Sequence, residues 1–179
     1  MKFQIEPARP EDAEALLAYL KQIGGESDNL TFGAEGLPLT AEQERVHLQS
    51  VLDSEDDIQL IVKQGGAIIA DASMQRFRRR MSHRAEIGIS VAKDYWGMGI
   101  GSALMAALLS FAKERGIRQL NLEVRSDNER AIRLYQKFGF QKLVTFPAFF
   151  RIDGRDVDFD LMNLDLTTRK EREHAASLL

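Results

Sequence analysis

The amino-acid sequence predicts a single α/β domain with a mixed, mostly antiparallel central sheet of about seven strands flanked by helices. Segments that alternate apolar and polar residues, as strands do, are interspersed with segments of helical periodicity. One glycine pair, Gly65-Gly66, and one Asp-Gly pair join neighbouring strand segments, which indicates antiparallel hairpins. A length of 179 residues with 44% hydrophobic residues suits one core.

The N-terminal part of the chain predicts one strand followed by two helices. FQIEPAR, at residues 3–9, has strand character. The next segment has acidic residues early, as a helix N-terminus favours, and Gly24-Gly25 is expected to end this first helix. Thr40 and Gln43 have the spacing of a capping box ahead of apolar residues, which predicts a second helix.

Three strands that lie close together in the sequence are expected next. IQLIVKQ and AIIADASMQRF are rich in β-forming residues and flank Gly65-Gly66, the turn of a hairpin. RAEIGISV, at residues 84–91, continues as a neighbouring strand. The glycine inside it, Gly88, fits a β-bulge, with tight packing as the alternative.

The second half of the chain predicts two helices and three strands. Apolar residues from position 100 to 111 share one helical face, and Gly116 is expected to end that helix. IRQLNLEVRS alternates as a strand, and Ser126 and Glu129 then have capping-box spacing ahead of another helix. KLVTFPAFFRI and RDVDFDLMNLDL flank an Asp-Gly pair, a strong hairpin signal.

Composition and charge narrow the function classes. A formal net charge of −3 gives no general attraction to nucleic acid, and the basic stretch 76–84 is interpreted as a solvated loop. No apolar run reaches 18 residues and the N-terminal segment is charged, so we expect neither a membrane span nor a secretory signal, and a cytoplasmic protein. The chain has no cysteine and its three histidines lack ligand spacing, so no metal site is predicted. We expect one domain at residues 1–166 and a polar C-terminal tail at 167–179.

The stretch DYWGMGIGSALM places Gly97, Gly99 and Gly101 immediately before a helix. Glycine permits unusual backbone angles and a close ligand, and the start of a helix presents unpaired N–H groups, so the turn predicts an anion site. A P-loop would need a lysine after the last glycine, where Ser102 stands instead. A dinucleotide fingerprint G-x-G-x-x-G would need a third glycine at the place of Ser102 or Leu104. The pyrophosphate of coenzyme A is the third candidate ligand.

At this turn the sequence resembles the GNAT superfamily of N-acetyltransferases. The family signature Arg/Gln-x-x-Gly-x-Gly/Ala corresponds to residues 96–101, WGMGIG, with Trp96 in the place of Arg or Gln. LEVRSDNERAIRLYQKFGF then resembles the family's strand, its Asn-x-x-Ala-x-x-Leu-Tyr helix and its Gly-Phe ending. Two linked motifs are more specific than either alone. The resemblance implies a GNAT-like fold over residues 1–166 and acetyl-CoA as cosubstrate.

The resemblance also implies individual roles. Tyr135 matches the family's tyrosine that protonates the leaving sulfur, and Glu86 and Glu123 are candidate bases where two strands would part. A core position for Tyr135, a helix cap at Asn128 and a hydrogen-bond network around the glutamates are the structural alternatives. The implied cofactor-binding residues are Ile89, Ser90, Val91, Trp96, Gly97, Met98, Gly99, Ile100, Gly101, Ser102, Asn128 and Tyr135.

These observations predict an acetyl-CoA-dependent N-acetyltransferase that acts on a primary amine. Because the chain has no cysteine, direct attack in a ternary complex is favoured over an acetyl-cysteine route. The acidic runs ESDNL (26–30) and DSEDD (53–57) could attract a cationic amine, either a small molecule or a protein amine. Polyamine, aminoglycoside, lysine side chain and peptide N-terminus all stay open, as does homodimerisation, and neither nucleic acid nor membrane is an expected partner. The alternatives are a non-catalytic acyl-CoA-binding regulatory module on the same fold and a dinucleotide-binding enzyme.

Overall fold

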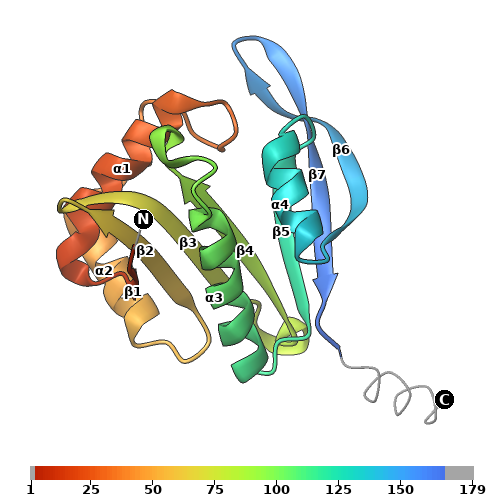
Figure 1. The fold of residues 1–179 in the computed structure, drawn as a ribbon, viewed down its shortest axis with the longest axis horizontal. Coiled ribbons are helices and arrows are strands. Elements are labelled where there is room, and N and C mark those ends of the chain that lie inside the picture. Colours follow the sequence, from red (N-terminus) through yellow and green to blue (C-terminus); the bar gives the residue numbers. More distant parts are fainter. Residues whose placement is uncertain (1–2, 168–179) are drawn as a thin grey trace.

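A seven-stranded sheet runs through residues 3–167, the part of the chain that the structure, a computed structural model, describes (Figure 1). The strand order is β1-β2-β3-β4-β5-β7-β6. The strands are β1 (Ile5–Pro7), β2 (Ile58–Gln64), β3 (Ala67–Arg76), β4 (Arg84–Val91), β5 (Gln119–Arg125), β6 (Gln141–Ile152) and β7 (Arg155–Asp165). All neighbours are antiparallel except β4 and β5, which confirms the predicted fold class.

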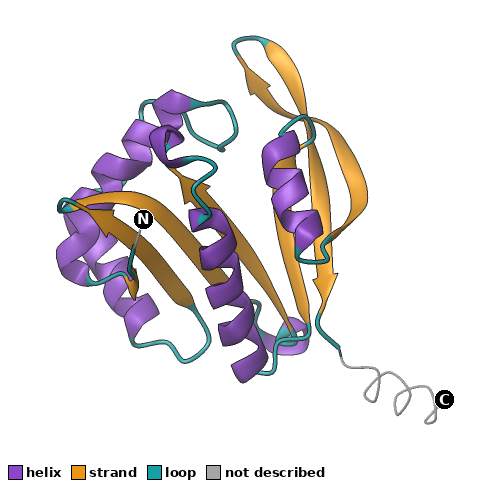
Figure 2. Cartoon of the chain, viewed as in Figure 1, coloured by secondary structure: helices purple, strands orange, loops and turns teal. Residues whose placement is uncertain are grey.

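Helices cover both faces of this sheet (Figure 2). They are α1 (Ala13–Glu26), α2 (Ala41–Leu52), α3 (Ile100–Glu114) and α4 (Glu129–Lys137), with short 3-10 turns at Pro10–Asp12, Arg79–Met81 and Lys93–Tyr95. Buried side chains of α1 and α2 pack on Ile61 and Ile68, whereas those of α3 pack on Ala70, Ala72 and Met74 of the opposite face. The register of β2 and β3 shifts between Val62 and Lys63, and this irregularity breaks the alternation of β3, so that Ile68 packs in one core and Ala70, Ala72 and Met74 in the other.

β4 and β5 stay paired over a short distance only. Three register pairs join them, from Arg84 opposite Gln119 to Glu86 opposite Asn121. Beyond Glu86 the two strands part, while β4 keeps its full pairing with β3 as far as Val91. The sheet therefore opens between its fourth and fifth strands, and the gap lies beside the N-terminus of α3.

Most of the predicted boundaries are confirmed. Both residues of the Gly65-Gly66 turn and both of the Asp153-Gly154 turn have positive φ, as tight hairpins require. Thr40 and Gln43 form the predicted capping box, in which the Gln43 N–H donates to the Thr40 hydroxyl and the Gln43 side chain accepts from the Thr40 N–H. The predicted C-terminal tail lies, from residue 168 onwards, outside the described residues.

Three local predictions are wrong. Gly24-Gly25 does not end α1, which continues to Glu26. The reason for a glycine there is steric, because a Cβ on Gly24 would lie 2.1 Å from the carbonyl oxygen of Gly33, in the loop that folds back on the helix. Ser126 does not cap α4, since its hydroxyl instead donates to Asp160 at 2.7 Å. Gly88 does not form a bulge, because its pairing with β3 is regular, and a Cβ there would meet Ser73 Oγ at an ordinary 3.5 Å, so tight packing does not explain it either.

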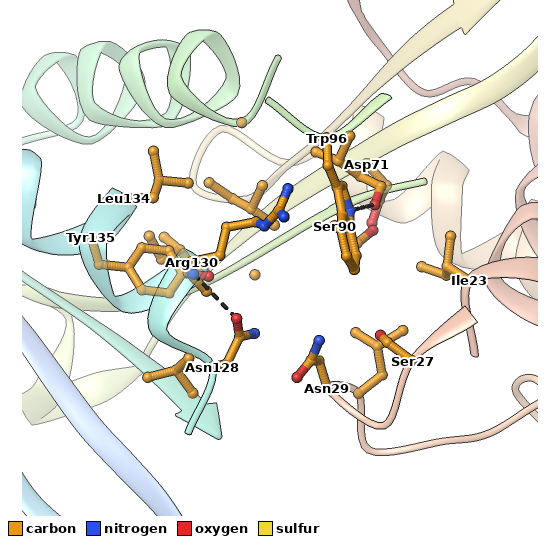
Figure 3. Close-up of a pocket in the computed structure, with 18 of the residues that line it drawn as sticks. Ile23, Ser27, Asn29, Asp71, Ser90, Trp96, Asn128, Arg130, Leu134 and Tyr135 are labelled. Atoms are coloured by element: carbon orange, nitrogen blue, oxygen red, sulfur yellow. Dashed lines mark hydrogen bonds between the residues drawn. The ribbon is translucent and has the colours of Figure 1, made fainter. Parts of the chain in front are cut away.

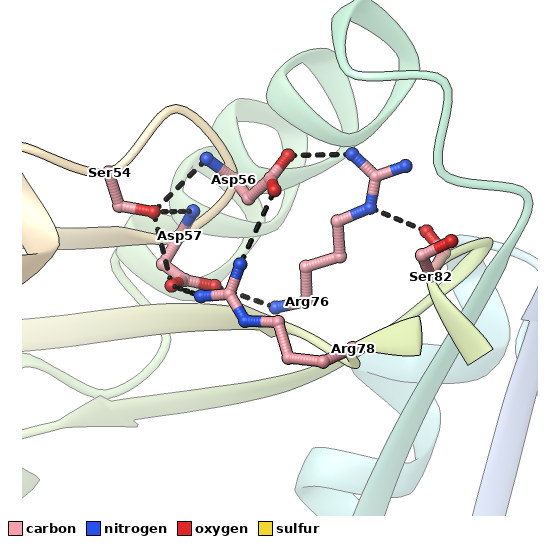
Figure 4. Close-up of polar contacts among 6 residues, drawn as sticks. All are labelled: Ser54, Asp56, Asp57, Arg76, Arg78 and Ser82. Atoms are coloured by element: carbon pink, nitrogen blue, oxygen red, sulfur yellow. Dashed lines mark hydrogen bonds and ion pairs between the residues drawn. The ribbon is translucent and has the colours of Figure 1, made fainter. Parts of the chain in front are cut away.

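The basic stretch 76–84 is only partly the solvated loop expected from the sequence. Arg76 pairs with Asp56 at 2.6 Å and Arg78 with Asp57 at 2.6 Å (Figure 4). The Arg76 backbone N–H also donates to Asp57 at 2.8 Å. These contacts join the loop before β2 to the end of β3, so Asp56 and Asp57 of the acidic run 53–57 are engaged in ion pairs within the fold, whereas Asp53 and Glu55 are exposed.

Candidate active site

A cavity of about 730 Å³ lies where β4 and β5 part (Figure 3). Its lining comes from both faces of the sheet. The segment from Ser27 to Phe32 and β3 contribute on one side, and the glycine turn with α3 and α4 contribute on the other. A single space is therefore reached by helices and loops that belong to separate cores.

The glycine turn forms one wall of this cavity. Gly97 and Gly99 have φ of 80° and 84°, and nothing lies within 4 Å of a Cβ built on either, so their role is to allow these backbone angles next to open space. Gly99 is the N-cap residue of α3, and no side chain caps that helix. Its first N–H groups and the positive end of its dipole therefore suit a phosphate. Gly101 has a different role, since a Cβ there would lie 3.2 Å from Leu134 Cδ2 of α4.

Trp96 is fixed at the mouth of the turn. Its indole Nε1 donates to the Val91 carbonyl oxygen at 2.6 Å. The guanidinium carbon of Arg130 lies 4.5 Å from the centroid of the Trp96 ring, a cation–π distance. A cation from α4 thus stands beside the glycine turn.

The free edge of β4 presents main-chain groups to the gap. The Val91 carbonyl points away from β3, towards Trp96. Because residues two apart along a strand present their N–H and C=O groups to the same side, those of Ile89 also face the gap that β5 leaves open. This edge can hold an extended ligand by hydrogen bonds of the kind that a neighbouring strand would make.

Carboxyl groups line the opposite wall. Glu86 of β4 belongs to the last pair of the two strands, Glu123 of β5 lies just beyond it, and both line the cavity. Partial removal from water raises the pKa of Glu123, and the nearby charge of Glu86 raises it further. Asp71 of β3 is a third carboxyl group, and burial raises its pKa to about 7 although Gln59 donates a hydrogen bond to it. A carboxyl group with a pKa of about 7, as at Asp71, can exchange a proton near neutral pH.

Tyr135 of α4 is buried, with its ring 5.9 Å from that of Phe140. It also lines the cavity. Burial raises the pKa of Tyr135 to about 12, so its hydroxyl stays protonated at neutral pH and can donate a proton.

Comparison with known proteins accounts for this arrangement. Residues 27–140, more than half of the chain, match the sequence model of the acetyltransferase (GNAT) family. This chain belongs to the GNAT family. Its structure superposes on the crystal structure of a GNAT-family acetyltransferase from Streptococcus pneumoniae with a TM-score of 0.87 and 30% sequence identity, over 92% of this chain and 99% of the other.

Two further relatives extend the comparison of this GNAT protein. N-alpha-acetyltransferase RimI of Mycobacterium tuberculosis is 36% identical over 95 residues, which are 52% of this chain and 58% of RimI, so the match spans less than two thirds of that relative. The GNAT phosphinothricin acetyltransferase Pat of Sinorhizobium meliloti, solved in complex with AcCoA, has a TM-score of 0.79 at 20% identity, over 93% of this chain and 89% of the other. At this level of sequence identity, the Sinorhizobium meliloti structure shows a shared fold only.

The structure brings the predicted site residues of this GNAT protein together, with one exception. Met98 does not line the cavity and is half exposed. Asn128 lines it but also caps α4, where its Oδ1 accepts from the Ala131 N–H at 3.2 Å. The predicted residues that line the cavity are Glu86, Ile89, Ser90, Val91, Trp96, Gly97, Gly99, Ile100, Gly101, Ser102, Glu123, Asn128 and Tyr135.

Sequence reasoning missed three charged residues of the cavity, Asp71, Arg130 and Lys137. Asp71 is the one charged residue in the apolar run AIIADAS. A charged residue inside a buried strand is costly, so its presence could have indicated a functional side chain. Arg130, Leu134 and Lys137 are spaced i, i+4 and i+7, so they share the side of α4 that lines the cavity. Helical periodicity could have placed Arg130 there once Leu134 was assigned to that side.

Among residues 3–167 no group of three or more His, Asp or Glu side chains is arranged to hold a metal ion. Within the same range no helix has both the length and the apolar character that crossing a membrane needs.

Proposed function

We propose that this protein transfers the acetyl group of acetyl-CoA to a primary amine, by direct attack within a ternary complex. The observation that carries the proposal is the cavity itself. One space joins a glycine turn suited to phosphate with a wall of carboxyl groups, and Tyr135 lines it. Acetyl-CoA would supply a thioester carbonyl as the acetyl donor.

Each residue group has a distinct task in this proposal. The main-chain N–H groups after Gly99 hold the pyrophosphate, and the free edge of β4 at Ile89 and Val91 holds the pantetheine arm. Ile89 N–H faces the gap and can stabilise negative charge that develops on the acetyl oxygen. We place the catalytic domain within residues 1–166.

Two proton transfers are assigned to side chains. An alkylammonium has a pKa near 10.4, so only about one molecule in 10³ is neutral at pH 7, and a base is needed to generate the nucleophile. Glu123, whose pKa is raised, and its neighbour Glu86 are the groups that accept this proton. Tyr135, protonated at neutral pH, donates a proton to the departing sulfur.

The charges of the two walls support a cationic acceptor. The ionisable side chains on the strand wall are Asp71, Glu86 and Glu123, whereas the basic lining residues, Arg130 and Lys137, both stand on α4. A second ammonium would be attracted to the strand wall, and a carboxylate beside the reacting amine would be repelled. We therefore propose a cationic amine without a neighbouring carboxylate as the acceptor.

The test follows thiol release from acetyl-CoA with a panel of diamines, polyamines, amino acids and peptides. Diamines and polyamines are expected to react best. Ser73→Lys, which adds a cation to the cavity lining, should reduce their reaction, while Gln64→Lys at the exposed hairpin is the control. If amino acids react as well as diamines, the proposed acceptor class is wrong, but the proposed acetyl transfer still stands.

Binding separates this proposal from its alternatives. Acetyl-CoA at a hundred times its Kd should stabilise the native protein by about 2.7 kcal/mol, and NAD should not match it. Stabilisation by acetyl-CoA without thiol release for any amine would favour a non-catalytic acyl-CoA-binding module. A larger melting shift with NAD would overturn the proposal.

A further inference from the structure

The glycine turn of this chain lacks the Arg or Gln side chain that its family signature supplies. Trp96 stands where Arg or Gln is usual, and its indole is uncharged, with a single N–H donor that is already bonded to the Val91 carbonyl. Coenzyme A carries a pyrophosphate and a 3′-phosphate, and main-chain N–H groups alone leave much of this charge unpaired.

A cation reaches the same place from another element. Arg130, the second residue of α4, lines the cavity and lies over the Trp96 ring, 4.5 Å from its centroid to the guanidinium carbon. Figure 3 shows its side chain extending from α4 across the cavity. The ring beneath it is itself held in place, since Trp96 Nε1 donates to the Val91 carbonyl. Trp96 thus acts as a rigid platform that limits the conformations of Arg130.

The charge of Arg130 is not neutralised within residues 3–167. The neighbouring carboxylate on α4, Glu129, pairs with Arg133 at 2.8 Å, and no carboxylate of the described residues lies within ion-pair distance of Arg130. A cation–π contact leaves the guanidinium charge and its N–H donors available to an anion.

We propose that Arg130, positioned on the ring of Trp96, is the phosphate-binding cation of this protein and replaces the side chain missing from its glycine signature. The inference rests on the proposed function, because the anion is a phosphate of acetyl-CoA. Arg and Trp together do what one side chain does in the signature, and the guanidinium can bind phosphate oxygens in a bidentate manner.

The test compares Arg130→Ala and Arg130→Lys with a control on the same helix, Arg133→Ala. Arg133 is two-thirds exposed, pairs with Glu129 and does not line the cavity. Calorimetric titration gives the affinity of each variant for coenzyme A, for 3′-dephospho-coenzyme A and for pantetheine. Trp96 is the only tryptophan of the chain, so its fluorescence gives a second, local measure of binding.

Arg130→Ala is expected to weaken coenzyme A binding by about 10- to 100-fold, the range of a charge-assisted hydrogen bond. Arg130→Lys should lose less, because it keeps the charge without the bidentate geometry. Arg133→Ala should change the affinity less than about two-fold, as exposed pairs contribute little. Pantetheine, which has no phosphate, should bind equally to all variants.

The dephosphorylated ligand shows which phosphate is bound. If Arg130→Ala weakens the binding of coenzyme A but not that of 3′-dephospho-coenzyme A, Arg130 binds the 3′-phosphate. If it weakens the binding of both ligands, Arg130 binds the pyrophosphate. An equal penalty for coenzyme A and pantetheine, or none for either, would overturn the inference. Wild-type protein that does not bind coenzyme A at all would instead overturn the proposed function.

Discussion

The two walls of the cavity are built from different kinds of group. The α3 wall presents main-chain N–H groups at a helix start, and the residues it requires are glycines at positions with positive φ. The strand wall presents side chains from three strands, among them Asp71, Glu86 and Glu123. A wall made of backbone fixes what it binds by shape and dipole, whereas a wall made of side chains can change its ligand with a single substitution. We therefore expect substitutions on the first wall to act on the cosubstrate and those on the second to act on chemistry and acceptor.

The largest effect is expected from Gly101→Asp on the backbone wall. Two unit charges about 4 Å apart at an effective dielectric constant of 20 repel by about 4 kcal/mol, so a carboxylate here should lower acetyl-CoA affinity by about 100-fold or more. Calorimetric titration measures it. Gly101→Ala is the control for crowding against Leu134, and it should lose much less. A folded Gly101→Asp protein with wild-type affinity would show that this turn does not hold the phosphates.

Tyr135→Phe should lower kcat by about 100-fold, the lower end of general acid catalysis, because a thiol of pKa about 8.5 is already a good leaving group. The ring keeps its packing on Phe140, so the melting temperature and acetyl-CoA affinity should change little. Steady-state kinetics with a separate binding measurement decide the matter. If the Tyr135→Phe variant keeps the wild-type kcat, Tyr135 is a residue of the core and not the general acid.

Glu123→Gln should lower kcat/KM by about 10- to 100-fold at pH 7, and the loss should shrink towards pH 10 as the amine loses its proton unaided. The raised pKa of Glu123 places its proton uptake closer to neutral pH than that of an ordinary carboxylate. Glu86→Gln, measured over the same pH range, tests the neighbouring carboxylate. Flat pH profiles of the loss in both variants would indicate a water relay instead of either glutamate.

Asp71→Asn should give the smallest effect, a change in stability with pH. Burial raises the pKa of Asp71 from 3.8 to about 7, and Glu44 adds to the rise. The folded protein therefore binds more protons than the unfolded chain between these values, and the free energy of unfolding contributed by Asp71 falls as pH increases through this range.

The Asn variant does not titrate, so its melting temperature relative to wild type should rise between pH 4 and pH 8, by about 2–4 °C for each 1 kcal/mol of cost removed. Asp53→Asn replaces an exposed carboxylate outside the cavity and is the control. A constant difference in melting temperature across this range would mean that Asp71 is ionised in the fold as it is in water.

Local signals were enough to predict the fold. Turn pairs such as Asp153-Gly154 and the capping box at Thr40 act within a few residues, so the sequence contains their full cause. Gly24 shows where this reasoning fails. Its glycine is required by the carbonyl of Gly33, and that contact exists only once the loop has folded back on α1. Ser126 likewise has the spacing of a nearby cap, while its actual partner, Asp160, lies on a distant strand.

The same contrast holds inside the cavity. The glycine turn could be predicted because its residues are contiguous and its dipole comes from the helix that follows. Asp71 and Arg130 could not, because each becomes a site residue only through neighbours brought by other elements, the pairing of β3 with β4 in one case and the ring of Trp96 in the other. Side-chain walls assembled from several strands therefore need the structure.

The short pairing of β4 with β5 leaves a length of sheet edge whose hydrogen bonds are not made within these two strands. If acetyl-CoA completes that edge, the cosubstrate acts as a missing strand, and the local stability of this part of the molecule rises with its concentration. Amides such as that of Ile89 would then exchange with solvent when the cosubstrate is scarce and become protected when it is plentiful. Because proteases cut chains that open locally, the lifetime of the protein would follow the supply of the molecule it consumes.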